Sequence, residues 1–87
     1  MKNRSDIDVL ALILYHASEN WRYQTHLMNS VSISHSQIIR HLSSAIDSGL
    51  ISRSVSSGQY KTTQLGLEFL EKHNKLQNYF KKNLLST

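Results

Sequence analysis

The sequence predicts a mainly α-helical domain that carries one small β-hairpin, a fold of the α+β class. Apolar residues recur at helical spacing in four segments. Between the third and fourth segments, two short runs alternate apolar and polar residues and flank Ser56-Ser57-Gly58, a sequence typical of a hairpin turn. The 87 residues leave room for a single domain, which we assign to 1–87.

The first helix is expected over residues 5–18. Ser5, followed by Asp8 three positions later, resembles a capping box, and the apolar residues that then recur at helical spacing are Ile7, Leu10, Ala11, Leu14 and Ala17. Residues 19–23 form either a loop or a short strand that pairs with the hairpin. A short second helix is expected over residues 25–30, with Thr25 as its N-cap.

The third helix is expected over residues 34–48. Ser34 is a good N-cap, and Gly49 stands where a left-handed residue ends a helix. The inner stripe is expected to consist of Ile38, Leu42, Ala45 and Ile46, with Ile39 at one edge. The hairpin follows over residues 50–62, with strands at 51–55 and 59–62.

The last helix is expected over residues 63–83, capped by Thr63. Only its first turns can pack on so small a body, so large apolar side chains of the remainder would face water unless a partner covers them. We therefore expect a coiled-coil-like homodimer contact; a helix folded back on the first helix is the alternative. The expected interface residues are Leu65, Phe69, Leu76, Tyr79 and Phe80.

Composition narrows the function classes. The formal net charge is +4 with a pI near 9.6, which favours polyanionic partners, although solubility alone also explains such a charge. The absence of cysteine excludes disulfides and thiolate metal sites. The five histidines lack the spacing of a helical zinc site, and no catalytic motif is present. We expect no enzyme, no cofactor and no metal site. With no signal peptide and no apolar run of about 20 residues, we expect a cytoplasmic protein without a membrane partner.

The predicted order of elements is the ground plan of a winged helix-turn-helix domain. The outward face of the third helix carries small polar residues around one arginine, which suits entry into the DNA major groove. Arg40 can bind guanine through two hydrogen bonds, and Gln37 can do the same with adenine. The alternative is an ordinary solvated face. The candidate DNA-binding residues of this helix are Ser34, His35, Ser36, Gln37, Arg40, His41 and Ser44.

Two further segments are candidates for phosphate contacts. In the hairpin, Arg53, Ser57 and Lys61 could hold the DNA backbone or reach a minor groove. At the start of the second helix, Thr25 and His26 could donate to a phosphate. Contacts of this kind fix the register of a protein on DNA and make its affinity sensitive to salt.

The chain resembles the archaeal winged-helix DNA-binding proteins that dimerise through a long C-terminal helix, the coiled-coil winged-helix family. The likeness covers nearly everything from Thr25 to His73 and is carried by Thr25–Met28, Ile33-Ser34, Ile38, Leu42, Gly49–Ile51, Tyr60–Thr63, Gly66 and Phe69–Glu71. It implies antiparallel pairing of the terminal helices and sequence-dependent or architectural DNA binding. The chain departs from the family pattern at Leu65, where a basic residue is usual, and at His41 and His73, where an aromatic is common.

The function predicted is therefore sequence-dependent binding of double-stranded DNA by a dimeric, nucleoid-associated transcriptional regulator. A nonspecific architectural DNA-binding protein and a winged-helix adaptor between proteins are the alternatives.

Overall fold

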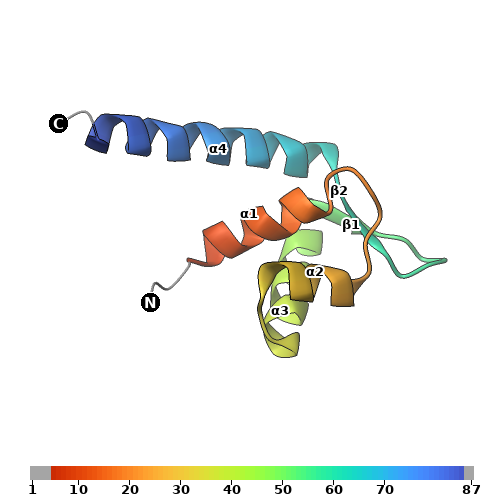
Figure 1. The fold of residues 1–87 in the computed structure, drawn as a ribbon. Coiled ribbons are helices and arrows are strands. Elements are labelled where there is room, and N and C mark those ends of the chain that lie inside the picture. Colours follow the sequence, from red (N-terminus) through yellow and green to blue (C-terminus); the bar gives the residue numbers. More distant parts are fainter. Residues whose placement is uncertain (1–4, 86–87) are drawn as a thin grey trace.

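The computed structural model describes the backbone of residues 5–85 and the side chains of residues 5–80. The elements follow in the order α1 (Asp6–His16), α2 (Gln24–Val31), α3 (His35–Asp47), β1 (Ile51–Arg53), β2 (Tyr60–Thr62) and α4 (Gln64–Leu85). In Figure 1 the first three helices form one body, the hairpin projects from one end, and α4 runs antiparallel to α1 and continues past it. This is the predicted fold class.

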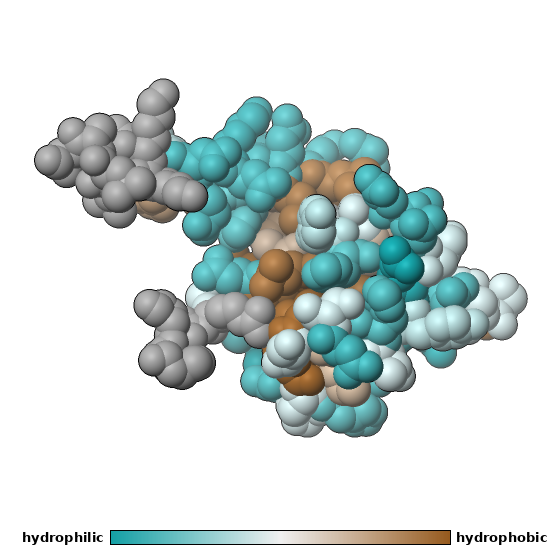
Figure 2. Space-filling view, viewed as in Figure 1, coloured by the Kyte–Doolittle hydropathy of each residue, from teal (hydrophilic) through white to brown (hydrophobic). Residues whose placement is uncertain are grey.

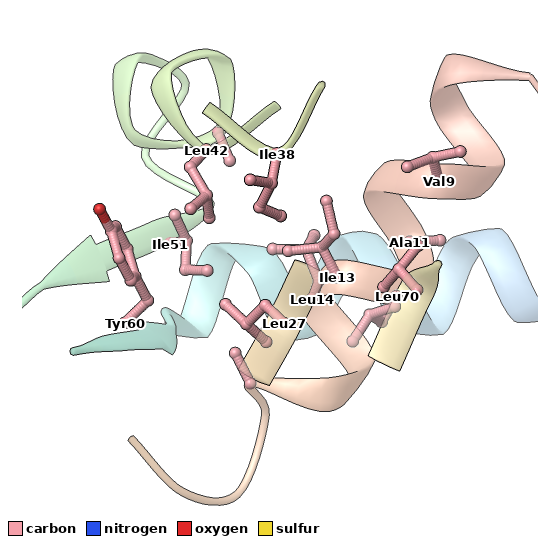
Figure 3. Close-up of a cluster of buried hydrophobic side chains, with 13 residues drawn as sticks. Val9, Ala11, Ile13, Leu14, Leu27, Ile38, Leu42, Ile51, Tyr60 and Leu70 are labelled. Atoms are coloured by element: carbon pink, nitrogen blue, oxygen red, sulfur yellow. The ribbon is translucent and has the colours of Figure 1, made fainter. Parts of the chain in front are cut away.

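Helix α1 is the central element of the core. Ser5 is its N-cap and accepts a hydrogen bond from the backbone N–H of Asp8 at 3.1 Å. The helix ends at His16, two residues earlier than expected. Its buried side chains Ile13 and Leu14 lie among buried side chains of α2, α3, the hairpin and α4 (Figure 3), so the core forms around this helix.

The segment before α2 pairs with the hairpin through an isolated β-bridge at Arg22. The backbone N–H of Arg22 donates to the carbonyl of Tyr60 at 2.8 Å, and the reverse bond measures 2.7 Å. This pairing keeps the chain extended up to Tyr23, which is the N-cap of α2 and makes no side-chain capping bond. The expectation that Thr25 caps this helix is therefore wrong, because Thr25 lies inside its first turn.

Helix α3 has the predicted ends and a partly different inner face. Ser34 and Gln37 form a reciprocal capping box, and Gly49, at a φ of 77°, follows the C-cap Ser48. Ile38, Leu42 and Ala45 are buried as expected. Ile46, which was expected in the inner stripe, is instead 39% exposed, and Ile39, which was expected at its edge, is 43% exposed. The remaining buried position of this helix is occupied by His41.

The strands of the hairpin are shorter than predicted. Arg53 pairs with Tyr60, so residues 54–59 form the loop between them. The loop closes on itself through backbone bonds between Ser54 and Gln59 and between Gly58 and Ser54, both 2.8 Å. The first bond joins residues that are opposite each other in the register of the two strands, and the second closes the turn at the tip.

The start of α4 is fixed to the rest of the fold by two threonines. Thr63 accepts a hydrogen bond from the N–H of Gly66 at 3.1 Å, as an N-cap does, and donates to the carbonyl of Gly49 at 2.6 Å. Thr62, which is buried, donates to the carbonyl of Leu14 at 2.6 Å. The end of the hairpin therefore connects α1, α3 and α4. No helix within residues 5–85 is long and apolar enough to cross a bilayer.

Candidate nucleic-acid interface

The outward face of α3, which the sequence predicts as the DNA-reading surface, is open to solvent. Its exposed side chains are small or polar: His35, Ser36, Gln37, Arg40, Ser43, Ser44 and Asp47. A helix whose outward side chains are small or polar can approach base edges closely. The bulkier Ile39 and Ile46 are also solvent-exposed residues of α3.

One of the two expected base-reading side chains is held within the protein. Oε1 of Gln37 accepts a hydrogen bond from the backbone N–H of Ser34 at 2.9 Å, while Oγ of Ser34 accepts one from the N–H of Gln37 at 3.2 Å. Reading adenine requires both the amide oxygen and the amide nitrogen. Gln37 would have to give up its capping bond to do so.

The other expected reader, Arg40, forms an ion pair. Its Nη1 donates to Oδ2 of Asp6, in the first turn of α1, at 3.3 Å. The two side chains are 57% and 74% exposed, and exposed pairs of this kind contribute about 0–1 kcal/mol. Arg40 therefore remains within reach of a ligand, with an anion at its side.

His41 does not lie on the outward face. It is buried beside the first turn of α1, with Nε2 3.9 Å from Oδ1 of Asp6. Burial lowers its pKa, and the charge of Arg40 lowers it further, whereas Asp6 acts in the opposite direction. The prediction that His41 contacts DNA is wrong for this conformation, because the packing of α1 against α3 encloses its ring.

The hairpin presents its two cations on opposite faces. Side chains of paired residues share one face of a sheet, and the pairs are Arg53 with Tyr60 and Ser52 with Lys61. The guanidinium of Arg53 lies 6.0 Å from the centre of the Tyr60 ring, on the face that is buried further along. Lys61 is on the other face. Ser57, at the tip, is exposed and accepts a bond from the N–H of Gln59 at 3.2 Å.

The first turn of α2 offers the remaining predicted residues. Thr25 and His26 are both exposed. Because Tyr23 provides no side-chain cap, the backbone N–H groups of this turn are left without a side-chain acceptor from the N-cap. An anion at this end would be favoured by the helix dipole.

Helix α4 carries the expected apolar stripe, and the stripe is unevenly covered. Phe69 packs partly against the core and stacks on His73. Leu65, Leu76 and Phe80 are each about half exposed, and Tyr79 more so. The His73 ring contacts α1, with Nε2 3.2 Å from Oδ1 of Asp8. This contact, with the Ser5 capping bond, holds the pKa of Asp8 below its usual value.

No cluster of three or more histidine and acidic side chains that could hold a metal ion occurs among the residues whose side chains are described. Helix α3 follows α2 in the sequence, a hairpin follows α3, and Arg22, just before α2, pairs with that hairpin. This arrangement is typical of a winged helix-turn-helix domain. A family model described as "Winged helix-turn-helix" matches residues 3–81. The chain belongs to the winged helix-turn-helix family.

The fold is also similar to a solved structure, that of a mutant of ZitR from Lactococcus lactis. The TM-score is 0.68 at 17% sequence identity, and the match covers 99% of this chain and 64% of the ZitR chain. This winged-helix protein therefore spans less than two thirds of the length of ZitR, and the likeness concerns the fold. No curated protein matches the sequence. Membership of the winged helix-turn-helix family supports DNA binding as the class of function.

Sequence reasoning missed Asp6 as part of the site. A carboxylate is favourable at the N-terminus of a helix, so the presence of Asp6 there needed no other explanation. Its partner Arg40 is 34 positions away in the sequence. No local pattern in the sequence links the two residues. The pairing depends on how α1 crosses α3.

Proposed function

We propose that this winged-helix protein is a dimeric transcriptional regulator that binds double-stranded DNA in a sequence-dependent manner. In this proposal α3 enters the major groove, and the wing and the first turn of α2 contact phosphates. It further locates the protein on the nucleoid, in the cytoplasm. The observation that carries the proposal is the exposed face of α3, where small hydroxyl side chains surround Arg40.

The wing supports backbone contacts more than base reading. Its cations lie at the two faces of the hairpin, and the loop hydroxyls are occupied in local bonds, such as that of Ser54 with the N–H of Ser57 at 3.2 Å. A wing of this kind can hold a phosphate with Lys61 or Arg53. It supplies affinity that falls with salt rather than discrimination between bases.

The dimer is supported by the apolar stripe of α4. Leu76 and Phe80 of this stripe are 53% and 51% exposed in the single chain. In Figure 2 hydrophobic residues gather in the middle of the face, around α1 and the base of α4, and hydrophilic residues surround them. A second copy of α4 would remove the stripe from water, and burial of the exposed half of each large side chain favours association by about 1 kcal/mol.

The test is a selection of bound duplexes from a genomic-fragment pool, repeated with Arg40→Ala. The variant is expected to bind about tenfold more weakly to the selected site and to lose preference at one or two base pairs, because a good arginine–guanine contact is worth about 1–3 kcal/mol. Lys72→Ala is the matched control, since it removes one positive charge from an exposed position on α4. Unaltered base preference in Arg40→Ala would show that α3 is not the reader.

A nonspecific architectural protein is the second candidate. It is favoured by the internal bonds of Gln37 and Arg40, which leave few free groups for reading bases. Competition with random-sequence duplex separates the two functions: a regulator stays on its selected site, whereas an architectural protein is displaced in proportion to the competitor. Either result is compatible with a binding protein rather than an enzyme.

A further inference from the structure

The ion pair on α3 occupies only part of the Arg40 guanidinium. Nη1 donates to Oδ2 of Asp6 at 3.3 Å, and a guanidinium has five N–H donors in a fixed fork. Among the residues whose side chains are described, none accepts a hydrogen bond from Nε or Nη2, and these groups remain for a second acceptor. The exposure of both side chains, 57% for Arg40 and 74% for Asp6, leaves that acceptor room to approach.

The two acceptors that DNA offers to an arginine differ in charge. Guanine presents N7 and O6 in the major groove, and both are neutral. A phosphate carries a full negative charge, and Arg40 would bring it next to the carboxylate of Asp6. The phosphate and the Asp6 carboxylate would then contact the same guanidinium, and their negative charges would repel each other. Guanine can therefore share Arg40 with Asp6, whereas a phosphate competes with it.

The Asp6 carboxylate keeps its negative charge next to Arg40. The only other basic group that is paired with it in the described part of the chain is His41, at 3.9 Å. Burial and the nearby arginine lower the pKa of His41, so the imidazole is neutral at pH 7. It packs against the Asp6 carboxylate without neutralising it.

We propose that Asp6 is a positioning residue that directs Arg40 to the edge of a guanine and away from DNA phosphates. The inference rests on the proposed function, since it needs α3 to lie in the major groove. It adds that the base read is a guanine. It also adds that Asp6, on a different helix from the reader, increases the preference for that base while lowering the affinity for DNA in general. The two effects can be measured separately.

The experiment uses the full chain with Asp6→Asn, and Asp8→Asn as its matched control. Both substitutions remove one charge from the first turn of α1, but Asp8 is paired with His73 instead of Arg40. Each variant is measured for affinity to a random-sequence duplex pool and for the base preference selected from that pool.

Asp6→Asn is expected to bind the random pool about two- to fivefold more tightly, as loss of an exposed charge partner allows, and to lose about three- to tenfold of its preference for guanine. Asp8→Asn is expected to keep the preference of the parent. Asp6→Glu, which retains a carboxylate, is expected to restore most of it. In an Arg40→Ala background, Asp6→Asn is expected to leave the preference unchanged, because Asp6 acts through Arg40.

Three results would overturn the inference. Full guanine preference in Asp6→Asn would remove the role of Asp6 and leave DNA reading by α3 intact. An equal loss of preference with and without Arg40 would show that Asp6 acts by another route. A parent protein that selects no sequence at all would reject both this inference and sequence-dependent regulation. Thermal unfolding of each variant checks that α1 keeps its capped first turn.

Discussion

Of the three glycines of the chain, Gly66 leaves the least room for an added methyl group. It lies in the first turn of α4, next to Leu50 in the connection between α3 and β1. A Cβ at this position would overlap the carbonyl oxygen of Leu50 and lie 2.5 Å from Cγ2 of Thr62, whereas ordinary carbon–carbon contacts are about 3.5–4.0 Å. Because a backbone carbonyl cannot change rotamer, relief requires α4 to move away by about 1 Å.

The cost of Gly66→Ala follows from what that shift disturbs. Overpacking costs about 1–3 kcal/mol. The shift also strains two bonds of Thr63, to the carbonyls of Leu50 at 3.0 Å and Gly49 at 2.6 Å, each worth about 1 kcal/mol. Alanine returns about 1 kcal/mol through its higher helix propensity. The expected loss in the free energy of unfolding is about 2–4 kcal/mol.

The measurement is urea unfolding followed by circular dichroism, at one fixed protein concentration because association adds to apparent stability. The control is the pair Lys72→Gly and Lys72→Ala at an exposed position of the same helix. There the alanine variant is expected to be more stable by about 1 kcal/mol, the opposite sign to that at residue 66. A Gly66→Ala protein as stable as the parent would refute the close approach of α4 to the Leu50 carbonyl.

Three other predictions concern buried polar groups and the surface of α4. Thr62→Val should lower the free energy of unfolding by about 1–2 kcal/mol in urea titrations, because the buried carbonyl of Leu14 loses its donor; the exposed Thr25→Val should change it by less than about 0.5 kcal/mol. The folded-state pKa of His41 lies below its ordinary value of 6.5, so the unfolded chain binds the proton more readily and stability falls as pH drops below 6.5. His41→Leu should reduce the loss of stability seen on lowering the pH from about 7.5 to about 5.5, and an unchanged pH dependence would contradict the burial of the ring. Leu76→Glu should convert a dimer to a monomer in sedimentation equilibrium without lowering the helix content, since the side chain is 53% exposed; a dimer that persists would place the contact elsewhere.

The sequence predicted those features of the fold that short-range hydrogen bonds and periodicity control. Ser34 was predicted as the N-cap of α3, and the residue whose N–H it accepts, Gln37, is only three positions away; Gly49, predicted to end the helix, directly follows its C-cap. Such signals act within one turn of the chain, so they are the same in any tertiary context. The pairing of the segment around Arg22 with the hairpin was predicted only as one of two alternatives.

What the sequence by itself determined about this protein is the order of its elements, the N-caps of α1, α3 and α4, and the polar character of the outward face of α3. The tertiary structure alone decided that His41 is buried while Ile46 is exposed. It also decided that Arg40 of α3 pairs with Asp6 of α1, which is 34 positions away in the sequence. The physical reason is that burial and ion pairing depend on where another helix crosses. Helical periodicity fixes only the direction in which a side chain leaves its own axis.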